Sequence, residues 1–197
     1  QSAGRRGFEY LGEPWRLARL NGKPGGWILE VLDTRIPDFD KKPVSSVSES
    51  NAAQDVALAT NRDGSVVAVL GKPVRVYKRK DSTLTKVFEG DLPWVNRHFQ
   101  ISPDGNRLWT GAGVFETATG KQICKSDRAG VEVPPNGAGY SEWTAPNRIL
   151  EIALVKADWP GAPPDAMERA FVVWDADTGK RLKTEDAPDA NALCVSP

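Results

Sequence analysis

The chain has little of the side-chain chemistry on which many enzymes and metal proteins depend. Its 197 residues include one histidine, one methionine and two cysteines. A single histidine, His98, excludes a metal site built on two histidines. No Gly-x-Ser-x-Gly motif supplies a nucleophile for which His98 could act as the base. We therefore expect no catalytic residue, no metal site and no cofactor, and we interpret His98 as satisfying local hydrogen bonds.

Cysteine is equally scarce. Cys124 and Cys194 fall in separate predicted strands. Isolated cysteines of this kind act more often as small apolar residues than as halves of a disulfide or as metal ligands. We interpret both as small buried apolar residues.

The chain also lacks an excess of charge and any long apolar run. Its 26 basic and 26 acidic side chains cancel, so it does not have the electrostatic pattern of a protein that binds nucleic acid or a membrane surface. No apolar run approaches the roughly 20 residues that cross a bilayer. We expect neither a nucleic-acid partner nor membrane insertion. The sequence does not determine the cellular compartment, and the cytoplasm is slightly favoured.

What the sequence does contain favours an all-β fold. Hydrophobic residues make up 40% of the chain and include seven tryptophans, enough for a packed core. Fifteen prolines and 18 glycines are spread along the chain. This composition suits many short strands and turns better than helices.

Residues 99–121 show the pattern most clearly. Phe99 and Ile101 alternate with polar residues, and a Ser-Pro-Asp-Gly turn follows at 102–105. Two further short apolar segments come next, separated by the Gly-x-Gly turn at 111–113. The stretch therefore predicts three strands of an antiparallel meander.

The turn motif at 102–105 recurs along the chain. Asn-Arg-Asp-Gly at 61–64 precedes the Ser-Pro-Asp-Gly turn by 41 positions, and Ala-Pro at 145–146 follows it by 43. A second phrase, aromatic-acid-x-x-Thr-Gly-Lys, occurs at 115–121 and at 174–180. A fixed period of about 40 residues indicates a repeat architecture.

These motifs resemble the WD-repeat β-propeller, in its common bacterial form. The resemblance is good over residues 54–197 and implies an all-β arc of four-stranded antiparallel blades, about three complete and others partial. One departure is that Gly90 and Asp91 stand where each repeat usually opens with Gly-His. We therefore expect the hydrogen-bond network that this histidine normally joins to be missing.

The repeat predicts strand positions, domains and a core. Twelve strands are expected at 56–60, 66–70, 74–78, 84–88, 99–101, 107–110, 114–116, 122–125, 139–144, 149–155, 170–174 and 181–184, and a further blade starts at 192–195. We assign residues 1–50 to a linker and a partial blade, with strands at 15–20 and 27–34 and a candidate outer strand at 44–47. Residues 51–197 are assigned to propeller blades truncated at the C-terminus. The expected core includes Phe99, Ile101, Leu108, Val114, Val172 or Val173, Leu193 and Val195.

An incomplete set of blades leaves two blade faces uncovered. Propellers avoid this by closing into a ring. We expect the chain to be a fragment of a longer propeller or, as the alternative, a subunit that completes its ring with another copy. In either case the open blade faces predict self-association.

Two connections are longer than a minimal repeat needs. One runs from Lys156 to Arg169, where the preceding blade has only Gly111–Gly113, and the other runs from Ser126 to Ala138. In the propeller family both connections emerge on the same face, and long loops on a rigid scaffold often bind partners. The candidate binding residues are Trp159, Asp158, Asp165, Glu168 and Glu132.

Trp159 is the expected anchor of this site, because a tryptophan between Asp158 and Pro160 has no strand-face position to fill. The alternative is that it folds back onto its own blade. The acids favour a partner with basic residues, although nearby lysine and arginine dilute the field.

These observations favour a protein–protein interaction scaffold that is not an enzyme. The alternative is a hydrolase or lyase on a propeller scaffold, which the fold alone does not exclude. An enzyme should gather several acids and arginines with perturbed pKa values around the central channel.

Overall fold

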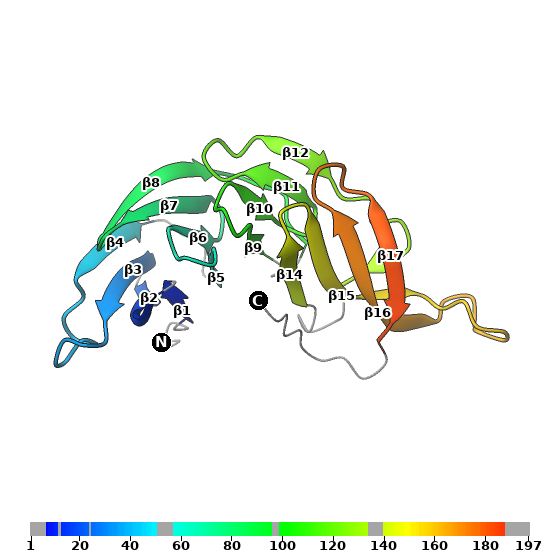
Figure 1. Cartoon of the computed structure of the whole chain (residues 1–197), viewed down its shortest axis with the longest axis horizontal. Coiled ribbons are helices and arrows are strands. Elements are labelled where there is room, and N and C mark those ends of the chain that lie inside the picture. Colours follow the sequence, from blue (N-terminus) through cyan, green and yellow to red (C-terminus); the bar gives the residue numbers. More distant parts are fainter. Residues whose placement is uncertain are drawn as a thin grey trace. The chain divides into compact units, whose positions relative to one another are not determined.

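The fold is that of a computed structural model, which describes residues 7–11, 13–23, 25–50, 57–95, 99–133 and 140–187. These ranges contain strands, turns and loops and no helix, and the strands form antiparallel sheets (Figure 1). The all-β prediction is confirmed. His98, Cys194, Leu193, Val195 and the strand predicted at 192–195 lie outside the described residues.

The first sheet contains β1 (Gly7–Leu11), β2 (Glu13–Lys23), β3 (Gly26–Asp33) and β4 (Ser45–Ser50), hydrogen-bonded in that order. The sequence predicted part of a blade here, and its strands at 15–20, 27–34 and 44–47 correspond to β2, β3 and β4. The serine-rich strand β4 still pairs with β3, because the outer strand of a sheet can carry polar side chains toward solvent. The division between domains at residues 50 and 51 stays a prediction.

The second and third sheets repeat this order and follow the predicted pattern closely. The second consists of β5 (Ala57–Thr60), β6 (Val66–Leu70), β7 (Val74–Lys80) and β8 (Thr83–Gly90). The third consists of β9 (Gln100–Ile101), β10 (Arg107–Trp109), β11 (Gly113–Glu116) and β12 (Gln122–Lys125). β6 and β12 have the predicted bounds, and the other strands differ from theirs by one or two residues at one or both ends.

The fourth sheet has an additional strand. It contains β13 (Val131–Glu132), β14 (Tyr140–Ala145), β15 (Arg148–Lys156), β16 (Met167–Asp175) and β17 (Arg181–Asp186). β13 and β14 both pair with β15, at different positions along it. The sequence did not predict β13, because two residues are too few to show an alternating pattern.

The chain divides into two compact units. The first comprises residues 1–92, 101–107 and 116–121, and the second comprises residues 93–100, 108–115 and 122–197. In the first unit the first two sheets share one core, in which the rings of Trp27 and Tyr77 meet edge to face with centroids 6.3 Å apart. The core residues of this unit are Ala18, Leu20, Trp27, Leu29, Val31, Val67, Val69, Tyr77 and Leu84.

The core of the second unit is built around Trp109 and Trp174, whose ring centroids lie 5.8 Å apart. Around them pack Val114, Val131, Trp143, Ile149, Ala153, Val155, Ala170, Val172 and Ala176. The partly buried Cys124 packs against this core, and its thiol lies 3.4 Å from the Ala176 carbonyl oxygen that accepts its hydrogen bond. Of the described residues predicted to be buried, Phe99, Ile101, Leu108, Val114 and Val172 are buried, whereas Val173 is half-buried.

The repeated turn phrase has a local cause. In the first copy the amide of Asn61 closes the hairpin, and in the second the hydroxyl of Ser102 does so in the same way. The Asn61 Oδ1 accepts the backbone N–H of Val66 at 2.8 Å, and the Ser102 Oγ accepts that of Arg107 at 2.9 Å. The two residue types recur at equivalent positions because both can cap a turn with a side-chain oxygen.

At the repeated Thr-Gly-Lys motif the backbone of the glycine lies very close to the preceding sheet. Gly120 and Gly179 have φ angles of +68° and +72°. A Cβ on Gly120 would lie 2.2 Å from the ring of Phe88 on β8, and one on Gly179 would lie 2.0 Å from the carbonyl oxygen of Lys125 on β12. Each glycine therefore permits both a left-handed turn and contact with the outer strand before it.

We predict that Gly179→Ala lowers the free energy of unfolding by about 3 kcal/mol or more, because it adds a clash with rigid backbone to the strain of a positive φ. Gly130→Ala is the matched control. Gly130 has φ +68°, and a Cβ added there would have nothing within 4 Å, so only the strain of about 1 kcal/mol applies. Denaturant unfolding measures both. Equal losses would contradict the close-approach explanation.

Candidate interaction site

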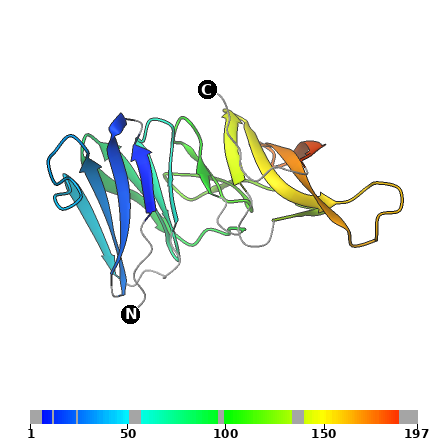
Figure 2. The same cartoon turned by 90° about the horizontal axis from the view of Figure 1, so that it is seen from below.

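The β15–β16 hairpin extends past β14 and β17. Its pairing continues through Leu154–Arg169, Val155–Glu168 and Lys156–Met167. The hairpin loop therefore comprises only Ala157–Ala166, and the prediction of a loop from Lys156 to Arg169 was too long. Figure 2 shows this loop, in yellow to light orange, projecting beyond the neighbouring strands of the fourth sheet.

Both edges of the extended hairpin are braced. On one edge β13 pairs with β15, through Val131 opposite Val155 and Glu132 opposite Leu154. On the other edge the backbone N–H of Ala187 donates to the carbonyl of Arg169 at 2.9 Å. The loop is thus carried on a sheet and not on a free two-stranded ribbon, which would be marginally stable by itself.

Two consecutive turns fix the conformation of the hairpin loop. The N–H of Ala162 donates to the carbonyl of Trp159 at 3.0 Å, and the intervening Pro160-Gly161, with φ +87° at Gly161, has the pattern of a type II turn. The N–H of Ala166 donates to the carbonyl of Pro163 at 3.0 Å. The bond from the N–H of Ala157 to the carbonyl of Ala166, at 2.9 Å, closes the loop.

Trp159 opens the first of these turns, and 48% of its surface is exposed. The core tryptophans Trp109 and Trp174, by contrast, are 0% exposed. About half of the indole surface is therefore accessible to a partner.

The predicted acidic residues lie at the same end of the fourth sheet. Asp158 and Asp165 are exposed in the hairpin loop, and Glu168 is half-buried on β16. Glu132 is exposed on β13 and lies opposite Leu154, whereas Glu168 lies opposite the next residue, Val155. Because neighbouring residues of a strand point to opposite faces, the side chains of Glu132 and Glu168 leave opposite faces of the sheet. The structure brings the two long connections together, but it does not gather their acids on one face.

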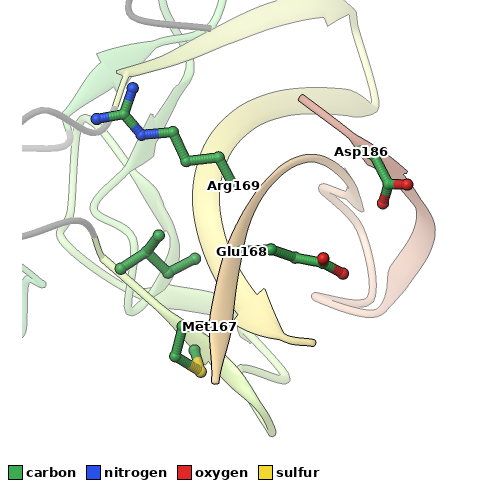
Figure 3. Close-up of a pocket in the computed structure, with 5 residues that line it drawn as sticks. Met167, Glu168, Arg169 and Asp186 are labelled. Carbon is green, nitrogen blue, oxygen red and sulfur yellow. The ribbon is translucent and has the colours of Figure 1, made fainter. Parts of the chain in front are cut away.

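An open pocket of about 440 Å³ lies at the base of the hairpin. It is lined by Leu154, Met167, Glu168, Arg169 and Asp186. Figure 3 shows the side chains of Glu168 and Asp186 on one side of β16 and those of Met167 and Arg169 on the other. Because its charged groups do not converge, the pocket has no arrangement suited to enclosing a small ligand.

A buried carboxylate at the centre of the hairpin was not predicted. Glu151 on β15 is 0% exposed, and Arg128 donates to its two oxygens at 3.0 and 3.1 Å. The indole N–H of Trp174 donates to the same carboxylate at 2.8 Å. The sequence held one signal for it, a lone acid within the apolar run 149–155.

Burial raises the pKa of the Glu151 carboxyl, while Arg128 and Trp174 oppose that rise. These donors hold the carboxylate in place. Arg128 also begins a turn in which the N–H of Val131 donates to its carbonyl at 2.9 Å. The ion pair therefore positions β13 beside the hairpin.

Other kinds of site have no support in the ranges that the structure describes. There, no three histidine, cysteine, aspartate or glutamate side chains are grouped as metal ligands. The same ranges contain no helix with the length and apolar character needed to cross a membrane.

No family model and no curated protein sequence matches the chain. Solved structures do. The chain is similar to BamB from Moraxella catarrhalis (TM-score 0.57, 11% identity, 94% of this chain and 52% of that one). It is also similar to a chain of the mitotic checkpoint complex (TM-score 0.57, 18% identity, 92% and 53%) and to one in the complex of KlAtg21 with the coiled coil of AgAtg16 (TM-score 0.56, 14% identity, 87% and 54%).

These similarities show the fold, which is a β-propeller of antiparallel four-stranded blades. The four sheets described above correspond to its blades. The chain spans about half the length, 52% to 58%, of four of the solved structures that it matches.

We predict that Glu151→Gln lowers the free energy of unfolding by about 3 kcal/mol, because it leaves the guanidinium of Arg128, whose side chain is 14% exposed, without a counter-charge. Glu185→Gln is the matched control. It removes the partner of Lys183 in an exposed pair on the same sheet and should cost less than about 0.5 kcal/mol. Similar small losses for both variants, measured by denaturant unfolding, would show that the buried pair is not a structural tie.

Proposed function

We propose that the chain is a protein–protein interaction module whose contact surface is the hairpin loop Ala157–Ala166. The observation that carries the proposal is Trp159, half exposed at the start of a loop that two turns hold in one conformation. The loop is itself carried on a hairpin braced at both edges. This arrangement presents a large aromatic side chain to a partner.

The energetics of binding favour such a surface. Tryptophan is among the residues that contribute most to protein interfaces, because it buries a large area at low conformational cost. Pro160, Pro163 and Pro164 restrict the loop before any partner arrives. Less entropy is then lost on association than with a mobile loop.

The similar propellers support the same class of function. The KlAtg21 structure is a complex with a coiled coil, and another similar chain belongs to the mitotic checkpoint complex. For the chain described here a protein partner remains a proposal. The enzyme alternative has no comparable support, because the described carboxyl group with a raised pKa, Glu151, is fully engaged by Arg128 and Trp174.

We also propose that the chain forms part of a larger WD-repeat propeller of the bacterial type, with residues 51–197 as propeller blades. Its length, about half that of the matched structures, supports this proposal. The further blades would cover the outer faces of the terminal sheets. Self-association through those faces stays a prediction.

The proposal is tested by the binding of a random peptide library, displayed as an array, to the chain and to two variants. We predict that Trp159→Ala weakens peptide binding at least about tenfold and changes the free energy of unfolding by less than about 0.5 kcal/mol. Leu182→Ala is the control, since Leu182 on β17 is also 48% exposed but lies outside the loop.

Binding that survives Trp159→Ala would contradict the proposed contact surface, as would equal losses in the two variants. A large loss of stability in Trp159→Ala would place the indole in the core.

A further inference from the structure

Tryptophan in this chain repeatedly occurs with an arginine and a carboxylate. The guanidinium of Arg35 lies 4.9 Å from the ring centroid of Trp15 and donates to the two oxygens of Asp33 at 2.9 and 2.7 Å. The guanidinium plane can stack on an aromatic face while its edge pairs with a carboxylate. One arginine thus satisfies two neighbours at once.

The same three parts recur twice more. Arg128, which pairs with Glu151, lies 5.4 Å from the ring of Trp174. Arg75 lies 5.5 Å from the ring of Trp27 and pairs with Glu49 at 3.6 Å. In these cases all three parts come from the chain itself.

The hairpin loop contains a tryptophan and carboxylates but no arginine. Asp158 precedes Trp159, Asp165 lies in the same loop, and Ala157–Ala166 contains no basic residue. Within the described residues no cationic side chain covers the Trp159 ring. The exposed indole and its acidic neighbours are therefore open to a cation from outside.

The carboxylates at this end of the sheet also lack ion-pair partners in the part of the chain that the structure describes. Several acids elsewhere are engaged: Asp33, Glu89 and Asp175, for example, pair with Arg35, Lys86 and Arg148. Five acids at or beside the hairpin form no ion pair with any described residue, namely Glu132, Asp158, Asp165, Glu168 and Asp186. Of these, Asp158 and Asp165 lie in the loop with Trp159 and complement a basic partner there.

We propose, resting on the proposed function, that the hairpin loop binds a protein segment through an arginine that stacks on Trp159 and pairs with Asp158 or Asp165. Arginine fits better than lysine because only a guanidinium offers both a flat face and a forked set of donors. Lys156, at the base of the loop, reduces the negative field but lies outside the turns that hold the indole.

The test uses a nine-residue glycine–serine peptide that carries two arginines, and matched peptides with lysine or citrulline in their place. Citrulline keeps the shape of arginine and removes its charge. Binding is followed by the NMR signal of the Trp159 indole N–H, identified by its disappearance in Trp159→Phe. We expect the arginine peptide to bind about tenfold more tightly than the citrulline peptide, with lysine between them.

The acids are tested with the double variant Asp158→Asn, Asp165→Asn, which should lose about tenfold in affinity for the arginine peptide. The control is Asp40→Asn, Asp91→Asn, which removes the same charge at exposed acids elsewhere and should bind normally. Equal binding of the arginine and citrulline peptides, or equal losses in the two double variants, would overturn the inference.

The outcomes also separate this inference from the proposed function. Library peptides that need Trp159 but bind equally well without arginine would overturn the arginine inference alone. Library binding that is indifferent to Trp159 would overturn the proposed contact surface, and the inference with it.

Discussion

The ion pair between Arg128 and Glu151 is the interaction on which the candidate site depends. A carboxylate on a strand buried in an apolar core must find a counter-charge, because an unpaired buried charge is very costly. Arg128 meets this need from the connection that leads to β13. Arg128 also begins the turn to Val131. The ion pair with Glu151 therefore also fixes the position at which β13 pairs with β15.

The other parts of the candidate site depend on this ion pair through β13. β13 braces one edge of the β15–β16 extension, and the extension carries a loop whose two turns fix Trp159. A buried pair of this kind need not make a protein more stable than apolar side chains would. Here its contribution is positional, since it selects one arrangement of a long connection that has little apolar content of its own.

The sequence was sufficient to predict the repeating part of the structure. Alternating apolar residues, turn chemistry at 61–64 and 102–105, and a period near 40 residues agree with one another, so twelve strands were expected close to their observed positions. The extension of the hairpin was not predicted, because Lys156 and the polar residues 168 and 169 interrupt the apolar pattern although their backbones continue to pair. The candidate residues were found from loop length and composition, but only the structure shows which acids form no ion pair with a described residue and that about half of the indole is exposed. The partner of Glu151 could not be predicted, because it lies 23 positions away on a connection without periodic signal.

The most direct test of this account is amide hydrogen exchange in the double variant Arg128→Met, Glu151→Leu. Replacing both charges by apolar side chains avoids leaving either one buried and unpaired. If the pair positions β13, protection at residues 131–132 and 154–156 should fall at least about tenfold while that of β6 and β7 in the first unit is unchanged. Undiminished protection of the hairpin in this variant would contradict the account.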